Sequence, residues 1–217
     1  KKHFIFFNFG NIFKTIMKAI LPIFYLPPVS WFAEFLDAQN EIILEQYEHF
    51  PKQTYRSRCT IYGANGKLVL ILPIHHNGKR AMKDIEISYA EDWQKLHWKS
   101  IKIAYQSSPY FEYYEDQLKQ IYSSQPKSLI DFNLNALNII LKILKEEKEF
   151  SLTEEYQKTP EATDLRAQFS AKKESNYLFS EYYQTFSDKL GFIADLSVLD
   201  LLCNMGPESA TYIKNIK

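Results

Sequence analysis

The chain has few cysteines and no excess of either charge. These two absences argue against a disulfide-rich secreted domain and against a general binder of polyanions. Cys59 and Cys203 are its two cysteines among 217 residues, too few for the disulfide framework of a small secreted domain. Its histidines and cysteines stand at spacings that match no zinc site, so we expect no bound metal. The 26 basic residues balance the 26 acidic ones, which argues against general binding to nucleic acid or to anionic membranes.

The chain also contains no apolar run long enough to cross a bilayer, so we expect no membrane insertion. Lys1 and Lys2 precede an apolar stretch at residues 4–7, as in a signal peptide, but polar residues interrupt it and no small-residue cleavage site follows. We therefore interpret residues 1–16 as a non-native or disordered N-terminal extension and expect one domain over residues 17–217. The predicted location is the cytoplasm.

Aromatic residues, by contrast, are abundant. The sequence holds 16 Phe, 15 Tyr and 3 Trp. Tyrosine has one apolar and one polar end, so it suits both a core and the wall of a pocket or interface. A tyrosine-rich core is the simpler interpretation and the one we favour, and an aromatic-lined pocket is the alternative.

The first ninety residues predict strands with one helix between them. A buried strand at 19–23, a helix over 29–36 and a strand at 41–45 have the length and order of a parallel βαβ unit. The segments 58–62 and 67–74 then predict a β-hairpin, because Gly63-Ala64-Asn65-Gly66 between them supplies the positive φ of a tight turn.

The rest of the chain is mainly helical in pattern. The expected elements are a strand at 85–88, helices at 93–105, from 110 and at 132–144, a short strand at 152–153, a polar surface loop at 164–176 and a helix within 190–202. The predicted fold is α/β: a small mixed, partly parallel sheet flanked by helices, with a C-terminal helical segment.

Arg56 and Arg58 are the strongest candidates for a binding site. Two arginines two residues apart on an extended strand point to the same face, where their charges repel each other. An anion between them relieves that repulsion, so a phosphate or carboxylate of a small substrate is one interpretation. Pairing with Glu45 and Glu48 on a neighbouring strand is the other, and the sequence does not separate the two.

His97 is the candidate catalytic base, because an imidazole titrates near neutral pH without tuning. Its place beside an apolar helix stripe equally fits a core histidine. Tyr25 ends the first strand, where open α/β sheets bind ligands, and is a candidate lining residue together with Tyr105. Gln53 and Tyr55 are expected to orient the bound group.

Several segments together resemble the WbqC-like protein family of bacteria. They are ILPIFYLPPVSWF at 20–32, QTYRSRC at 53–59, ANG at 64–66, LHWKSI at 96–101 and LSVLDLL at 196–202. The resemblance extends from about residue 19 to the end of the chain. In one respect the chain departs from longer members: it lacks a strand–helix insertion after Asp164-Leu165-Arg166.

The resemblance implies a role in bacterial surface polysaccharide or O-antigen biosynthesis. Family members are associated with acyl or aminoacyl transfer, including glycyl transfer, to an activated sugar. The expected partner is then a small anionic substrate, a nucleotide-sugar or a carrier-bound acyl group; no cofactor or oligomeric state is implied. Two alternatives stay open: a non-catalytic binding protein for an anionic metabolite or partner enzyme, and a nucleotide-binding enzyme of adenylyl-transfer type.

Overall fold

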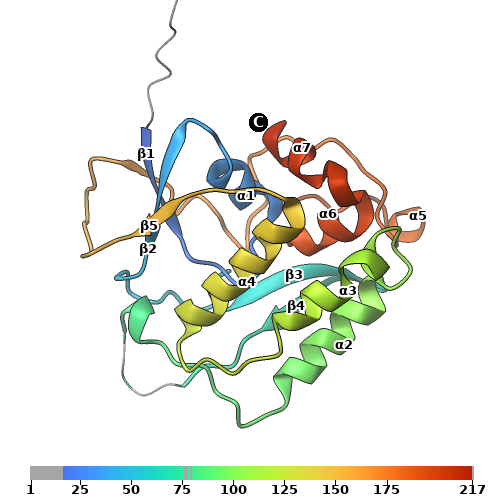
Figure 1. Cartoon of the computed structure of the whole chain (residues 1–217), viewed down its shortest axis with the longest axis horizontal. Helices are drawn as coiled ribbons and strands as arrows, with labels where there is room; N and C mark the ends of the chain where they lie inside the picture. Colours follow the sequence, from blue (N-terminus) through green and yellow to red (C-terminus); the bar gives the residue numbers. More distant parts are fainter. Residues whose placement is uncertain (1–16, 76–77, 79, 217) are drawn as a thin grey trace, which may run out of the picture.

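The computed structural model describes residues 17–75, 78 and 80–216 (Figure 1). The expected extension at residues 1–16 lies outside the described residues. The strands are β1 Met17–Pro22, β2 Asn40–Glu45, β3 Arg58–Gly63, β4 Gly66–Ile71, β5 Phe150–Leu152 and β6 Thr163–Asp164. The α-helices are α1 Val29–Phe35, α2 Trp93–Tyr105, α3 Phe111–Gln120, α4 Leu129–Leu144, α5 Ser187–Leu190, α6 Val198–Met205 and α7 Ser209–Lys214, with 3-10 turns at Met82–Asp84 and Gly206–Glu208.

Four strands form a parallel sheet in the order β5-β2-β1-β6. The chain lays down β1, β2 and β5 in one direction and then returns to place β6 on the other side of β1. Leu21 of β1 and Leu44 of β2, which pair in the sheet, are fully buried in the hydrophobic core. The predicted βαβ unit is therefore confirmed, with β1 and β2 paired in register from Met17 and Asn40.

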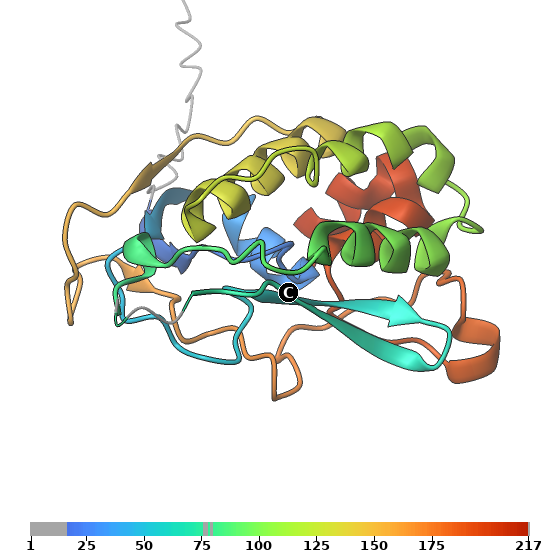
Figure 2. The same ribbon diagram turned by 90° about the horizontal axis from the view of Figure 1, so that it is seen from below.

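The predicted hairpin is also confirmed, but it forms a separate two-stranded sheet of β3 and β4. Gly66, which closes its turn, has φ +104. Figure 2 shows α2 and α3 lying on one side of the hairpin, while the chain between α4 and α6 passes along the other. The α/β class is thus confirmed, and its parallel and antiparallel pairings belong to two different sheets.

The C-terminal segment packs against the start of α1 and forms backbone hydrogen bonds with it. Val29 N–H donates to the Leu196 carbonyl at 3.0 Å, and Val198 N–H donates to the Pro27 carbonyl at 3.0 Å. Beneath them Trp31 stacks on Phe35 with ring centroids 4.7 Å apart. Eleven aromatic side chains are buried, and others that are partly buried pack against the core. No helix within the described ranges is long and apolar enough to cross a membrane.

The strand predicted at 85–88 is wrong. Ile87 N–H donates to the Lys127 carbonyl and Ser88 N–H to the Pro73 carbonyl, so neighbouring residues bond to different segments and only isolated bridges form. The segment 164–176, predicted as a surface loop, contributes Asp164 to β6 and then lines a pocket.

Gly206, which ends α6, is a position where a methyl group should be poorly tolerated. Its φ is +56, and a Cβ there would lie 2.4 Å from Cδ1 of Tyr110. We expect Gly206→Ala to lower the free energy of unfolding by about 2–4 kcal/mol, through strain and overpacking together. Gly66→Ala is the matched control, because it adds a Cβ at φ +104 with nothing within 4 Å. Equal losses in urea denaturation would show that the Tyr110 contact contributes nothing.

Candidate functional site

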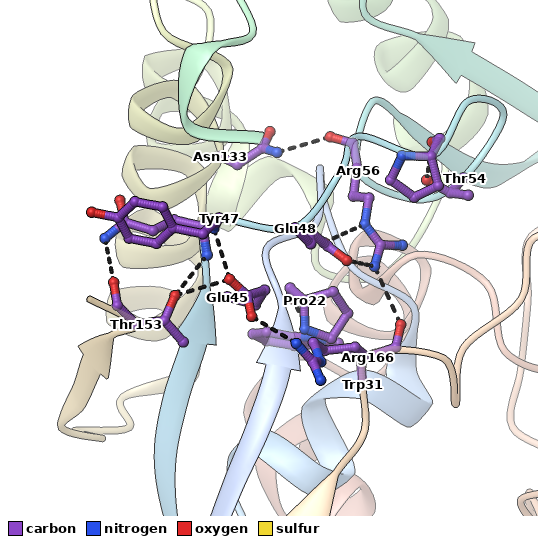
Figure 3. Close-up of polar contacts among 12 residues, drawn as sticks. Pro22, Trp31, Glu45, Tyr47, Glu48, Thr54, Arg56, Asn133, Thr153 and Arg166 are labelled. Atoms are coloured by element: carbon purple, nitrogen blue, oxygen red, sulfur yellow. Dashed lines mark hydrogen bonds and ion pairs between the residues drawn. The ribbon is translucent and has the colours of Figure 1, made fainter. Parts of the chain in front are cut away.

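The carboxyl edge of the parallel sheet is where charged side chains converge. In a sheet of this kind, ligands bind outside the carboxyl ends of the strands, at the point where the strand order reverses. Here that point lies between β1 and β6, because β2 and β5 extend the sheet on the opposite side of β1. Figure 3 shows two acid–arginine pairs at this edge.

The first pair joins Glu45, at the end of β2, to Arg166, just after β6. Arg166 Nη1 lies 2.9 Å from Glu45 Oε2, and Arg166 Nη2 lies 2.6 Å from Asp164 Oδ2. These hydrogen bonds from Arg166 hold the pKa of the Asp164 carboxyl below its usual range. Glu45 also accepts hydrogen bonds from Thr153 Oγ1 and from the Tyr47 N–H (Figure 3). The network thus links the ends of β2, β5 and β6.

The second pair joins Arg56 to Glu48 in a buried, two-pronged contact. Arg56 Nε donates to Glu48 Oε1 at 2.6 Å, and Nη2 donates to Glu48 Oε2 at 2.7 Å. The same Nη2 donates to the Arg166 carbonyl at 3.2 Å, which connects the two pairs. Arg56 is 4% exposed, and its guanidinium lies over the Phe24 ring at 5.3 Å. Its charge is therefore neutralised within the protein.

The expected arginine fork is wrong in its geometry. β3 begins at Arg58, while Arg56 lies in the preceding turn, where Ser57 N–H bonds to the Thr54 carbonyl. The alternation that would place both guanidiniums on one face does not apply there. Arg58 is half-buried, and within the described part of the chain it has no acidic partner. Its Nε is buried without a hydrogen bond. Of the two arginines, Arg58 alone keeps a cation available.

His97 lies inside the core, 4% exposed, on α2. Its Nδ1 is 3.0 Å from the Tyr25 hydroxyl, which is 2.6 Å from the Tyr122 hydroxyl. The imidazole stacks on the Tyr25 ring and meets the edge of Trp93. The structure therefore brings His97 and Tyr25 together, as a buried cluster joined by Tyr122.

Burial and hydrogen bonds together determine whether the His97 ring carries a charge. Burial lowers the pKa of His97 to about 4, although a hydrogen bond with the Ile71 backbone opposes the shift. With the ring neutral, a tautomer in which Nδ1 accepts from Tyr25 leaves the other nitrogen free to donate to the Ile71 backbone. Tyr25 in turn accepts from Tyr122, so each group is satisfied. His97 therefore occupies the position of a core histidine, which was the alternative interpretation of its place on the helix.

The other predicted site residues lie apart. Tyr105 is fully buried, and its hydroxyl accepts from the Tyr62 N–H of β3. Gln53 is exposed at φ +60 in the turn before β3. Tyr55 is half-buried and packs on Phe24 with centroids 5.5 Å apart; burial raises its pKa to about 12. Of these three, Tyr55 lies beside the carboxyl edge, through its contact with Phe24, two residues after the end of β1.

A polar pocket of about 340 Å³ is lined by parts of the segments that follow β1 and β6 in the chain. Ser30, in the first turn of α1, forms one wall, and residues 167–177 after β6 form another. Asp195 completes it: its carboxylate accepts from the Ser30 N–H and the Ser30 hydroxyl, both at 2.8 Å. Burial raises the pKa of Asp195, against the effect of these hydrogen bonds, and its φ is +54. Positive φ is uncommon for a non-glycine residue, and Asp adopts it more readily than most.

Sequence reasoning missed Ser30, Arg166 and Asp195. The i, i+2 spacing of Asp164 and Arg166 was a usable signal, because it places both on one face of an extended segment. Asp195 has no comparable pattern: it reaches Ser30 across the fold. Among the described residues no group of three or more histidine, cysteine or acidic side chains is arranged to hold a metal ion.

These features define an α/β protein with a parallel sheet and a polar pocket formed by the segments that follow β1 and β6. The family model of WbqC-like proteins matches residues 24–181, and the chain therefore belongs to the WbqC-like protein family. The uncharacterized protein Rv1507c of Mycobacterium tuberculosis is 24% identical over 224 residues, covering 90% of this chain and 96% of that protein. No solved structure matches the chain.

Proposed function

We propose that this protein is an acyl- or aminoacyl-type transferase, with glycyl transfer as one form, that acts on an activated sugar in bacterial surface-polysaccharide biosynthesis. The observation that carries the proposal is the polar pocket formed by the segments that follow β1 and β6, where the Asp195 carboxylate accepts hydrogen bonds from Ser30. Membership of the WbqC-like family supports the setting.

In this proposal Asp195 takes the role first considered for His97. Burial raises the pKa of the Asp195 carboxyl, which makes its carboxylate a stronger base than a free one, and its oxygens lie beside the Ser30 hydroxyl at the pocket wall, whereas the buried His97 ring has a lowered pKa and stays neutral. Asp195 would accept the proton of the attacking sugar hydroxyl or amine. Arg58 has no acidic partner among the described residues and lies outside the lining of this pocket; it would bind an anionic group of a substrate that extends beyond the pocket, with Tyr55 beside it.

The decisive test is turnover by an Asp195→Asn variant. Purified protein would be incubated with nucleotide-sugars and either acetyl-coenzyme A or glycine with ATP. Mass spectrometry would then detect the acylated or glycylated sugar. We expect Asp195→Asn to reduce the rate by roughly 100-fold or more, as for loss of a general base. The amide still accepts from the Ser30 N–H, so the melting temperature should change little. Asp188→Asn, at an exposed position of α5, is the matched control.

A non-catalytic binding protein is the second candidate, and the buried state of Arg56 and His97 favours it. It predicts a rise in melting temperature with a nucleotide-sugar or pantetheine, no product, and unchanged binding in Asp195→Asn. Release of pyrophosphate from ATP would instead indicate adenylyl transfer.

A further inference from the structure

A second pocket lies away from the sheet edge, between α2 and the end of α3. Its volume is about 640 Å³. One side is the loop at 89–92 with the first turns of α2, and the other is the segment 119–125. Three half-buried aromatic residues line it: Tyr89, Trp98 and Tyr122.

The walls of this pocket are held in place before any ligand arrives. Gln94 Nε2 donates to the carbonyls of Tyr122 and Ser124, at 3.0 and 2.8 Å, and its Oε1 accepts from Gln125. The Tyr89 hydroxyl donates to the Pro126 carbonyl, and that of Tyr122 bonds to Tyr25. A preformed pocket loses little entropy on binding.

The charges around the pocket cancel. Glu91 and Asp92 are balanced by Lys95 and Lys119, and Asp92 already pairs with Lys95 at 2.6 Å. The pocket therefore does not select a strongly anionic group. Hydrogen-bonding capacity remains at its rim: across the part of the chain that the structure describes, the indole N–H of Trp98 and the ammonium of Lys119 make no hydrogen bond.

From these features we propose that this pocket binds the pyranose ring of a sugar. A pyranose has an apolar face of C–H groups, which suits an aromatic wall, and a rim of neutral hydroxyls, which suits amide, indole and lysine groups. The base of a nucleotide would also stack here, but the pocket has no net positive charge to attract the phosphates of that nucleotide. The role of this pocket in transfer rests on the proposed function, while sugar binding itself is a separate property.

Saturation-transfer NMR tests the proposal without turnover. The probes are the methyl α-glycosides of glucose, galactose and mannose, N-acetylglucosamine, and uridine monophosphate as the nucleobase comparison. We expect transfer to the ring protons of at least one pyranose, and a roughly tenfold weaker affinity in Trp98→Leu. Leu96→Ala, on the same helix with its side chain exposed and outside the pocket, should bind as the parent does.

Tryptophan fluorescence gives a second readout, because Trp31 and Trp93 are buried and Trp98 is half-buried. If Trp98→Leu fails to fold, the exposed rim residues Lys119 and Gln125 replace it as a double variant, Lys119→Met with Gln125→Leu, which should also weaken binding. No transfer to any pyranose in folded protein, binding that is unchanged in the folded variant, or Trp98-dependent binding of uridine monophosphate alone would each overturn the proposal. The Asp195→Asn turnover test concerns the other pocket, so the two proposals fail separately.

Discussion

Arg56→Ala is expected to lower the free energy of unfolding by about 3–5 kcal/mol. The substitution removes one half of a buried ion pair and leaves Glu48 without its guanidinium partner. Burial already raises the pKa of Glu48 even with Arg56 present, so the unpaired carboxyl should bind a proton instead of remaining charged. Urea denaturation at pH 7, followed by circular dichroism, measures the loss.

Three further variants separate structure from binding. Glu48→Ala should be about as harmful as Arg56→Ala, while Arg56→Met with Glu48→Leu should recover most of the stability, because two apolar side chains carry no desolvation penalty. Arg58→Ala is the control at the neighbouring arginine, which has no acidic partner among the residues described. A stable Arg56→Ala protein that has lost ligand binding would contradict this account and return Arg56 to the binding site.

The arginines show how far the sequence predicts the site. It identified the residues and even one of the partners, since Glu48 was a stated alternative to a ligand. It failed on Arg56, which was treated as part of an extended strand although the predicted hairpin strand begins at 58; a turn at residues 54–57 breaks the alternation of side chains there. Strand faces can be read from sequence only when the strand boundaries are known to within one residue.

The sheet shows a different limit. β1 and β2 were predictable because each is a run of buried apolar residues. β6 has only two residues, both exposed, and it is held by pairing with β1 and by the contacts of Arg166. No local pattern marks such a strand. The strand order, and the pocket lined by the segment after β6, could therefore not be predicted.

For His97 the helix and its buried face were predicted correctly, since Trp93 and Ile101 share its stripe. The ambiguity lay in its partners. Tyr25 and Tyr122 come from segments 72 and 25 positions away in the sequence, and periodicity along one helix carries no information about them. The same contacts that argue against catalysis give the histidine a measurable effect on stability.

Acid should destabilise the protein through His97. Its pKa in the folded protein is about 4, below the value of about 6.5 expected in the unfolded chain, so the unfolded state binds the proton more readily between these values. The stability that the neutral ring contributes is complete above pH 6.5 and falls as the pH decreases. By pH 4 the loss amounts to about 3 kcal/mol.

The measurement compares the parent with His97→Asn by urea denaturation at half-unit steps from pH 7 to 4. Asparagine keeps an acceptor for Tyr25 but does not titrate, so the difference in stability between the two proteins should shrink toward acid pH. Other buried groups, such as Asp200, whose pKa burial raises to about 6, contribute in the opposite direction but equally in both proteins. His49→Asn, at an exposed histidine, controls for the loss of one imidazole. A constant difference across the range would mean that His97 titrates as it does in the unfolded chain, and the buried tyrosine–imidazole cluster would then be wrong.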